Sequence, residues 1–520
     1  MYRLITITLI FLLFAIANAQ NNAPQVSNVV AVADTQNRVV TITYDLSDVE
    51  QDSIKIDLRI SGDSGTTYLL LVDSTAGDIG YPILPGINKQ ITWQYEPGLI
   101  KLSDQTSNCF RAKIIADDLY EIDIQEIVNR VDSLAMRQDL QAIEGVRHFS
   151  ANPTAWAATK TFIENKFIAH NLQARRHEFS YSNVTGANII GRHPGHTEEE
   201  KTYIVDGHFD TVSSTPGADD NGSGTVGMLE AMRVLSGYQF ARTVVFIGFD
   251  LEEVGLVGSQ RYVSEAIPHY QQTEGVFNFE MIGYTCHQAG CDAFRPLGNY
   301  IHNIYDVNSS SLRVVFDQAA AAYVPGLVVL STQATPDNPN FRRSDHARFW
   351  DAGIKALFLT DGANFRNPHY HQPGDNTTTL DYTFMTNVVK TTVATVAKLA
   401  GVRHSGVGLS NFFDLNVTST SQGPPNQVNT FVLKQNFPNP FNPGTTIEYT
   451  LEKSSEITLK IFNLLGEEIR ILANKTQAAG THRVIWDGRN NTGKRVTSGV
   501  YVYKIEVDSQ LLAKKMVMLR

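Results

Sequence analysis

Histidine and acidic residues stand in this sequence at points where apolar, strand-like runs give way to loops. The run YIVDGHFD ends in His208 and Asp210, and the turn PGADDNGSG that follows carries Asp219 and Asp220. Residues two apart on a strand point to the same face, so Asp210 can accept one imidazole N–H of His208 while the other nitrogen binds a metal. A satisfied histidine at a strand end gives the same pattern, so this pair alone does not establish a metal site.

More acids and a second histidine follow in similar positions. The next strand-like run ends in Glu252 and Glu253, whose adjacent side chains diverge, so one can bind a metal while the other faces a substrate. Glu280 lies in the apolar run FNFEMIGY, where an acid is costly to bury unless it is paired or metal-bound. His371 lies in the loop sequence NPHYHQPGD.

Each of these groups alone has an ordinary explanation, such as a solvated loop acid, a helix cap or a surface pair. Their occurrence in order, at predicted strand ends of one region, is harder to explain in that way. Histidine and carboxylate are ligands that zinc accepts, and a carboxylate shared between two ions gives the ~3.5–4 Å separation of two-metal hydrolases. The pattern therefore predicts a metal site.

The elements that must position these residues alternate between helix and strand. From about Ile122, apolar residues recur with the helical period, and apolar runs of strand length then alternate with helical ones. The predicted helices are residues 124–136, 154–172, 223–237 and 384–401, and the predicted strands are 203–210, 241–250 and 355–360. This alternation predicts an α/β domain with a mostly parallel sheet flanked by helices, and functional groups at the carboxyl ends of the strands.

Short β-strands are predicted on both sides of this domain. Alternating runs at residues 39–46, 53–60, 67–72, 89–95 and 109–116 predict an N-terminal immunoglobulin-like or fibronectin-like β-sandwich. The last ninety or so residues return to β patterning and predict a C-terminal β-sandwich. The expected divisions are a signal peptide at 1–19, the first sandwich at 20–118, the catalytic domain at 119–402, a linker at 403–430 and the second sandwich at 431–520.

Length, charge and the first residues limit the possible classes of protein. The 520 residues suffice for about three domains. The net charge is −10 and no basic face is apparent, so we expect no nucleic-acid partner. Met1–Ala19 has Arg3, an apolar run and a small-x-small end, as secretory signals do, and the run is shorter than the ~20 residues of a membrane span. We therefore expect a secreted or cell-surface protein with no membrane span once processed.

The sequence contains three cysteines: Cys109, Cys286 and Cys291. Cys286 and Cys291 are close enough in sequence to close a small loop by a disulfide, which an exported protein can hold. A zinc site on this pair is the alternative, although a single C-x4-C without a second pair is a weak zinc signal. Cys109 is expected to be buried in its own domain.

Six motifs in order carry a resemblance to a known family. GHFD, PGADDNGSG, EEVGLVGS, NFEMIGY, RSDHARFW and HYHQPGD all lie between Ile122 and Gly401. This region resembles the co-catalytic zinc aminopeptidases, whose fold also serves the glutaminyl cyclases. The resemblance implies a zinc-exopeptidase-like fold and two Zn²⁺ ions. It also implies five metal ligands: His208, Asp220, Glu253, Glu280 and His371.

The resemblance also implies separate roles for these and neighbouring residues. His208 and Glu280 would be the terminal ligands of one zinc, Glu253 and His371 those of the other, and Asp220 the bridge between the ions.

Glu252 would be the general base, Asp210 would orient His208, and Tyr370 would help to stabilise the oxyanion. The family usually has aspartate where this chain has Glu280, and related peptidases use glutamate there. Leu251 stands where a glycine is common before the paired glutamates.

The tail resembles the C-terminal sorting domain of type IX secretion substrates. The likeness rests on NFPNPFNPGTTIEY (Asn436–Tyr449), FNLLGEEI, WDGRNNTGKRVTSGVYVYKI and the closing KKMVMLR. It implies that the type IX secretion machinery is a partner and that the tail is removed or anchored after export. A plain structural β-domain is the alternative.

These features together predict an exported zinc metallopeptidase. We expect an aminopeptidase that hydrolyses N-terminal residues from peptides or proteins through di-zinc-bound hydroxide, with Glu252 as general base. A carboxypeptidase or other amidase on the same fold is the nearest alternative. Glutaminyl cyclisation is a weaker alternative, because that chemistry resembles a single-zinc version of the fold and this chain keeps both sets of ligands. A non-catalytic surface binding protein with a degenerate peptidase domain is the alternative from another class. Loops between Cys286 and Ser344 are expected to contribute to the specificity pocket.

Overall fold

The computed structural model describes most of the chain between residues 21 and 518. The residues in that range that it does not describe are 64, 71, 96–109, 336, 414, 416–430, 434–435, 437–440, 442–443, 452, 464–467, 497–498 and 508–509. The predicted signal peptide and Cys109 therefore lie outside the described residues. Within the described residues, no helix is both long and apolar enough to cross a membrane.

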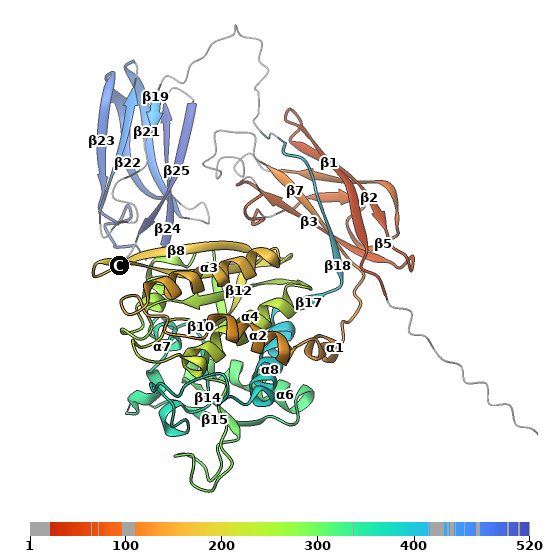
Figure 1. Ribbon diagram of the computed structural model, residues 1–520. Coiled ribbons are helices and arrows are strands. Elements are labelled where there is room, and N and C mark those ends of the chain that lie inside the picture. The colour runs from red at the N-terminus through yellow and green to blue at the C-terminus, as the bar shows by residue number, and fades with distance from the viewer. Residues whose placement is uncertain are drawn as a thin grey trace, which may run out of the picture.

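A mixed sheet forms the centre of the middle, α/β domain, for which a catalytic function is predicted (Figure 1). Within the described residues it has eight strands, in the order β15-β14-β16-β13-β10-β12-β9-β8. Their bounds are β8 Gln173–Tyr181, β9 Val184–His193, β10 Glu198–His208, β12 Arg242–Phe249, β13 Gln272–Glu280, β14 Tyr300–Tyr305, β15 Val328–Gln333 and β16 Ala356–Thr360. The central strands β12, β10, β13 and β16 run parallel to one another, so their carboxyl ends meet at one edge.

The helices cover both faces of this sheet. Their bounds are α1 Ile124–Asn129, α2 Ser133–Ile143, α3 Pro153–Ala169, α4 Gly224–Leu235, α5 Val257–Arg261, α6 Ser310–Tyr323, α7 His346–Asp351 and α8 Tyr382–Ala400. The short turns of helix are η2 Ala218–Ser223, η3 Tyr262–Ala266, η4 Val307–Ser309, η5 Pro339–Arg342 and η6 Ala363–Phe365. A small ladder joins β11 Gln239–Phe240 to β17 Val402–Arg403.

The central strands are apolar on both faces because each face has its own core. Tyr203 and Val205 of β10 belong to the core that contains α4 and α8, whereas Ile204 belongs to the core on the side of η3 and α7. This burial on both sides explains the continuous apolar runs from which these strands were predicted. The predicted fold class, a mostly parallel sheet flanked by helices with a β-sandwich at each end, is confirmed.

One predicted helix is two helices in the structure. The periodic region 124–136 is divided between α1 and α2, because the Asp132 carboxylate accepts the backbone N–H of Leu134 and begins α2 there. Such a cap satisfies a donor that has no partner inside the helix.

The N-terminal domain is the predicted β-sandwich, built from two sheets with the orders β1-β2-β6-β4 and β18-β7-β3-β5. The bounds are β1 Gln25–Asp34, β2 Val39–Ser47, β3 Ile54–Ser61, β4 Thr75–Gly77, β5 Gly80–Ile83, β6 Gly86–Gln94, β7 Arg111–Asp117 and β18 Ser405–Leu409. Strand β2 alternates buried and partly exposed residues, as a strand with one buried face does.

The predicted strand at residues 67–72 is wrong. Among its described residues, which exclude residue 71, this segment makes only an isolated bridge between Ile60 and Leu70. The backbone N–H of Tyr68 instead donates to the Glu199 carboxylate of the catalytic domain (3.1 Å), and the Lys113 ammonium lies 4.2 Å from the centre of the Tyr68 ring. Leu70 and Val72 pack against the core of the N-terminal sandwich without strand pairing, and an alternating apolar pattern cannot distinguish such packing from a strand.

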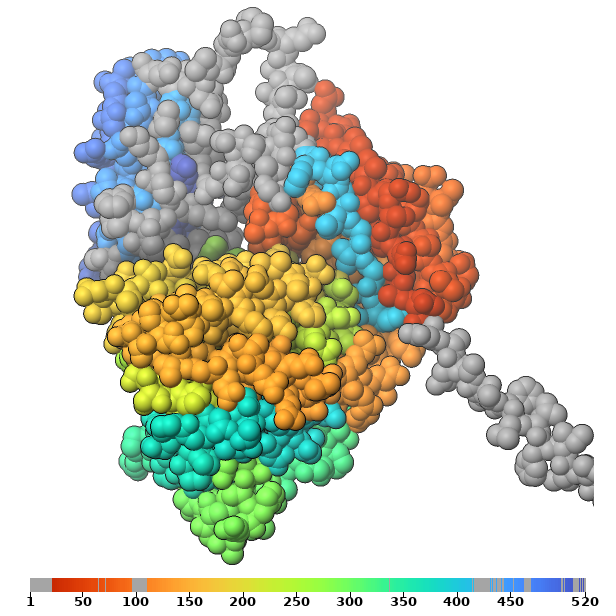
Figure 2. Space-filling model, viewed as in Figure 1, coloured from red at the N-terminus to blue at the C-terminus, as the bar shows by residue number. Residues whose placement is uncertain are grey.

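Part of the predicted linker is also wrong. Residues 405–409 form β18, which pairs antiparallel with β7, and Phe413 and Leu415 lie in the core of the N-terminal sandwich. Figure 2 shows the cyan segment that contains β18 lying along the red N-terminal domain. The chain therefore returns to its first domain after the catalytic domain ends. Residues 416–430 of the predicted linker lie outside the described residues.

The C-terminal domain also has two antiparallel sheets, with the orders β19-β20-β23 and β22-β21-β24-β25. The bounds are β19 Phe431–Leu433, β20 Thr445–Leu451, β21 Ser455–Asn463, β22 Glu468–Gln477, β23 Gly480–Trp486, β24 Gly499–Val507 and β25 Gln510–Met518. Trp486 and Tyr503 are fully buried in the core between these sheets.

The return of the chain to the first sandwich is testable with adjacent phenylalanines. Phe413 is 7% exposed in the sandwich core, whereas Phe412 is 53% exposed. We expect Phe413→Ala to lower the free energy of unfolding of this domain by about 3–5 kcal/mol, and Phe412→Ala to lower it by less than about 1 kcal/mol. Urea denaturation followed by the fluorescence of buried Trp93 measures both. Equal effects of the two changes would contradict the placement of this segment.

Candidate metal centre

The carboxyl edge of the sheet brings the predicted ligands together. His208 is the last residue of β10 and Glu280 is the last residue of β13. Glu252 and Glu253 follow β12, and His371 lies in the loop between β16 and α8. Because these strands are parallel neighbours, groups that are distant in sequence become neighbours in space.

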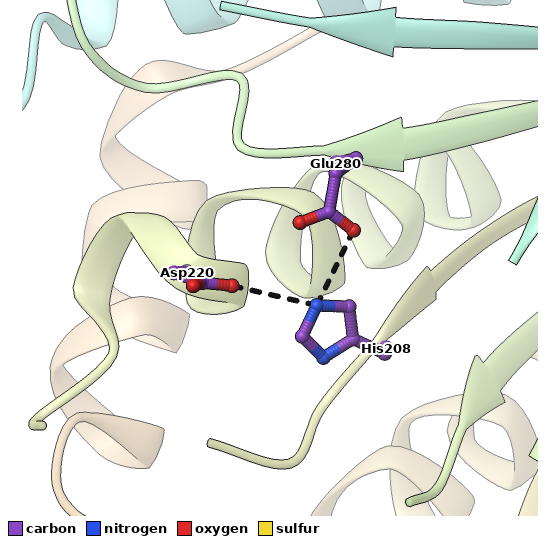
Figure 3. Close-up of side chains that lie close together, drawn as sticks. All are labelled: His208, Asp220 and Glu280. Carbon is purple, nitrogen blue, oxygen red and sulfur yellow. Dashed lines mark ion pairs between the residues drawn. The ribbon is translucent and has the colours of Figure 1, made fainter. Parts of the chain in front are cut away.

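His208, Asp220 and Glu280 form the first group of possible metal ligands (Figure 3). The Nε2 of His208 lies 3.5 Å from Asp220 Oδ1 and 3.3 Å from Glu280 Oε2. All three residues are buried. Figure 3 shows both carboxylates directed toward the same imidazole nitrogen.

Asp220, Glu253 and His371 form the second group. The Nε2 of His371 lies 3.0 Å from Asp220 Oδ2 and 3.4 Å from Glu253 Oε2. Asp220 therefore presents one oxygen to each histidine, which is the arrangement required of a carboxylate shared by two ions.

Unpartnered polar atoms show that these groups suit a cation. His208 Nε2, His371 Nε2, Asp220 Oδ2 and Glu253 Oε1 are buried without a hydrogen-bond partner among the described residues. A buried polar atom without a partner is costly, and cations bound in the two groups would satisfy these atoms. Imidazole nitrogens and carboxylate oxygens are ligands of zinc, so the donor set fits this metal.

The turn that carries Asp220 is fixed by a second aspartate. Asp375 accepts the backbone N–H of Asp219 at 2.8 Å and that of Asp220 at 3.1 Å. Gly207 allows the same turn to approach β10, because a Cβ at this position would lie 2.9 Å from the carbonyl carbon of Gly224. The position of Asp220 is thus determined by backbone contacts on two sides.

A buried arginine holds the other end of this turn. The Arg147 guanidinium donates to the carbonyl oxygens of Phe209 (2.6 Å), Pro216 (3.0 Å) and Gly217 (2.7 Å). Burial lowers the pKa of Arg147 to about 10, so the side chain stays charged at neutral pH. Its charge also lies near the site carboxylates and partly offsets them.

Asp210 connects the two halves of the site. Its carboxylate accepts the backbone N–H groups of Glu252 (3.1 Å) and Glu253 (3.2 Å). The Nδ1 of His208 lies 3.2 Å from the Asp210 carbonyl oxygen and 3.4 Å from its carboxylate. Asp210 therefore positions both glutamates as well as the histidine that the sequence predicted it to orient.

A hydroxyl group holds the Glu280 side chain in place. The similar family usually has aspartate at this position. Ser344 Oγ donates to Glu280 Oε2 at 2.6 Å, and this same oxygen faces His208. Ser344 belongs to the motif RSDHARFW, so the sequence contained the relevant residue without indicating its contact. The longer side chain is thereby fixed in the site.

Glu252 lies beside the ligands but belongs to neither group of possible ligands. Its Oε2 is 3.9 Å from His208 Nε2. Burial, together with the charges of Glu280 and Glu253, raises the pKa of the Glu252 carboxyl well above its ordinary value, against the opposing charge of His208. A carboxyl group with a raised pKa is suited to accept and return a proton.

The carboxylates around His371 change the pKa of its imidazole. Burial favours the neutral imidazole of His371, but Asp220 and Glu253 outweigh it and raise the pKa of His371 to about 10. The two histidines in turn lower the pKa of the Asp220 carboxyl, although burial acts in the opposite direction. These shifts show how strongly positive charge is favoured between the carboxylates.

Tyr370 lies at the rim of the site, next to His371. The two rings are stacked with their centres 3.8 Å apart. The Nη2 of Arg343 donates to the Tyr370 phenol oxygen at 2.9 Å. Because the oxygen accepts from Arg343, the phenol O–H can itself donate toward a substrate.

The structure thus brings together all eight residues that the sequence nominated for the site. The supporting contacts of Arg147, Ser344 and Asp375 were not predicted. Ser344 and Asp375 occur in motifs that were recognised, whereas Arg147 has no distinctive sequence signal, because its partners are backbone carbonyl groups.

An apolar pocket opens next to Glu280 and Tyr370. Its wall contains four phenylalanine rings, those of Phe294, Phe341, Phe358 and Phe365, so we call it the aromatic pocket. Burial lowers the pKa of the pocket residue His302 to about 4, so its ring is neutral at pH 7.

The loop that carries Phe294 is held in place by a disulfide and an ion pair. Cys286 and Cys291 form the disulfide, which excludes the alternative of a zinc site on this pair. The Arg366 Nε donates to the Asp292 carboxylate at 2.8 Å, and both side chains are fully buried. Phe294, from the segment between Cys286 and Ser344, thus lines a pocket, and the role of this segment in substrate specificity stays a prediction.

Two family models match parts of the chain. Residues 188–396 match peptidase family M28, and residues 442–510 match the FlgD Ig-like domain. The first match covers every residue of the two ligand groups.

Several curated proteins are similar to the same region. Aminopeptidase YwaD of Bacillus subtilis is 31% identical over 209 residues, which are 38% of this chain and 41% of YwaD. Leupeptin-inactivating enzyme 1 of Streptomyces exfoliatus is 30% identical over 214 residues, or 40% and 44% of the two chains. Leucine aminopeptidase 1 of Trichophyton rubrum is 27% identical over 258 residues, or 47% and 64%. The chain thus spans less than half the length of the first two relatives and less than two thirds of the third.

Solved structures are similar over a comparable part of the chain. BSAP, a zinc aminopeptidase from Bacillus subtilis, is 28% identical, with 43% of this chain and 52% of that chain covered and a TM-score of 0.36. The LapA aminopeptidase of Legionella pneumophila is 24% identical, with 54% and 77% covered and a TM-score of 0.43. In sequence, residues 188–396 are thus similar to peptidase family M28, and residues 442–510 are similar to the FlgD Ig-like domain.

Proposed function

We propose that this protein is an aminopeptidase that holds two zinc ions and removes N-terminal residues from peptides or proteins. The observation that carries the proposal is the position of Asp220, with one carboxylate oxygen facing His208 and the other facing His371. His208 and Glu280 would complete the ligands of one ion, and Glu253 and His371 those of the other. Bound zinc lowers the pKa of a water molecule to about 7 and polarises a carbonyl group.

The residues of the chain then divide the work of amide hydrolysis. The Glu252 carboxylate accepts the proton of the attacking water and returns it to the leaving amine. The Tyr370 hydroxyl donates to the carbonyl oxygen of the substrate as negative charge develops there. The Asp210 carboxylate accepts the backbone N–H of Glu252 and so holds this residue in place.

The aromatic pocket supports release of an apolar residue. It lies directly beside Glu280 and Tyr370, so the side chain next to the scissile bond would enter it. A neutral His302 adds no charge to its wall. A charged side chain would lose much of its hydration against the phenylalanine rings of this pocket, which is costly.

Two observations favour this function over the alternatives. The similar proteins include an aminopeptidase and a leucine aminopeptidase, which supports action at the amino terminus over that of a carboxypeptidase. The complete set of ligand groups, four of whose buried atoms lack a hydrogen-bond partner among the described residues, supports an enzyme over a degenerate binding domain.

Adjacent glutamates provide a matched test of this function. Glu252→Gln is expected to lower kcat about 10²–10⁴-fold without loss of zinc, because it removes a proton acceptor and no ligand. Glu253→Gln is expected to lower the zinc content from two ions per chain toward one. Hydrolysis of leucyl-p-nitroanilide and elemental analysis of zinc measure the two effects.

Full activity of the Glu252→Gln protein would reject the role of Glu252. A wild-type protein that holds no zinc after mild purification and cleaves no peptide would instead favour the non-catalytic alternative.

The pocket assignment is testable with two residues of one loop. Phe294 lines the pocket and is 42% exposed, whereas Leu297 is 39% exposed and does not line it. We expect Phe294→Ala to lower kcat/KM for phenylalanyl substrates about 3- to 10-fold, through lost aromatic contact, with little change for alanyl substrates. Leu297→Ala should alter neither. A uniform loss for all substrates would argue against a pocket for the released side chain.

We also propose that the protein is exported and that its C-terminal domain serves type IX secretion. The disulfide between Cys286 and Cys291 supports an oxidising compartment. The FlgD Ig-like match supports a separate C-terminal β-domain without indicating sorting. Deletion of residues 431–520 should retain the protein inside the producing cell, as measured by fractionation and immunoblotting. Unchanged export of the truncated chain would reject the sorting role.

A further inference from the structure

Arginine side chains gather in the cleft above the candidate metal centre. Arg342, Arg343 and Arg348 line this cleft together with the site carboxylates. All three come from the short segment η5, α7 and the residues between them. The cleft therefore has an acidic floor and a basic wall.

Only part of this positive charge is neutralised by the protein. Arg342 and Arg348 share a single carboxylate, that of Asp351. Arg343 has no ion pair with any described residue. Within the described residues, the three guanidinium groups of the wall thus form ion pairs with one carboxylate, that of Asp351.

Arg343 is exposed but held in a defined position. Its Nη1 donates to Asn364 Oδ1 at 2.8 Å and its Nη2 donates to the Tyr370 phenol oxygen at 2.9 Å. A guanidinium has five N–H groups, so donors are left for a further acceptor. Because this long side chain is already fixed, less conformational entropy is lost when a ligand binds to it.

The arginines lie where the part of the substrate beyond the scissile bond would bind. The aromatic pocket would take the side chain of the released residue, and the arginine-lined cleft opens beside it over Glu252 and Glu253. Arg343 lines both, so it lies at their boundary. The part of the peptide beyond the scissile bond would then pass along the arginine wall.

We propose that Arg343, assisted by Arg342 and Arg348, binds a substrate carboxylate on the leaving-group side of the scissile bond. This inference rests on the proposed aminopeptidase function and names its substrate class. The carboxylate would be either the C-terminus of a very short peptide or an acidic side chain just beyond the bond. Arginine binds carboxylates through two parallel N–H bonds, which suits either source. Bound divalent cations would offset the acidic floor, so it would not repel this group.

Binding can be measured without turnover in zinc-loaded Glu252→Gln protein. Isothermal titration calorimetry compares leucyl-glycine, which has a free carboxylate, with leucyl-glycinamide, which does not. We expect the free acid to bind about tenfold more tightly, as for a hydrogen-bonded ion pair of modest exposure. Equal affinities would overturn the proposal.

The source of the carboxylate is resolved by a second pair of ligands. Leucyl-glutamyl amide and leucyl-glutaminyl amide differ only in the charge of the second side chain. Tighter binding of the glutamyl compound supports recognition of an acidic side chain. A preference confined to leucyl-glycine supports recognition of the peptide C-terminus.

Variants in the same background assign the preference to Arg343. Arg343→Gln should remove the difference between leucyl-glycine and its amide, and Arg343→Lys should retain part of it. Arg176→Gln, which changes an arginine paired with Glu164 away from the cleft, is the matched control and should retain all of it. Thermal unfolding and zinc content confirm that each variant is folded and loaded.

Two results separate this proposal from simpler roles. If Arg343→Gln weakens both ligands equally, the arginine acts only through Tyr370, and carboxylate recognition is overturned. If the wild-type protein hydrolyses leucyl-glycine and leucyl-glycinamide with equal kcat/KM, this proposal is overturned but the aminopeptidase function stands. Binding of the acid without hydrolysis of any peptide would instead reject the aminopeptidase function.

Discussion

The fold of the catalytic domain is organised around one buried carboxylate between two imidazoles. Asp220 is 2% exposed, and each of its oxygens faces a different histidine. A buried charge is tolerated only where opposite charge or hydrogen bonds surround it. The position of Asp220 therefore requires His208 at the end of one strand and His371 on a distant loop to converge. The parallel sheet makes this possible because its strand ends meet at one edge.

A second set of contacts makes the arrangement rigid. Asp375 fixes the backbone at Asp220, Asp210 fixes the backbone at Glu252 and Glu253, and Arg147 ties together the carbonyl groups of the intervening turn. These partners act mainly on backbone atoms. They fix the backbone from which both glutamate side chains project. In the proposed function, Glu253 can then bind a metal while Glu252 stays free to carry a proton.

The sequence predicted the ligands well because they follow recognisable apolar strands and occur in ordered motifs. It predicted less of the rest, for identifiable reasons. The segment at 67–72 has a strand-like pattern, but its Tyr68 N–H bonds to Glu199 in another domain. Strand β18 was predicted as linker because its glycines and small residues give no periodic signal, and only pairing with β7 orders it. Arg147 could not be found, because contacts with carbonyl groups leave no mark on the sequence of the partners.

Chemistry and specificity are positioned by different parts of the domain. The proposed ligands His208 and Glu280 end strands whose side chains fill both cores, so their positions are tied to the stability of the sheet. The pocket and the arginine wall instead lie on segments between strands, held by local contacts such as the Arg366–Asp292 pair. Changes in those segments can alter which substrate is accepted without moving the ligands, because loops tolerate substitution better than buried strands do. This separation explains how one metal centre can serve different substrates on the same fold.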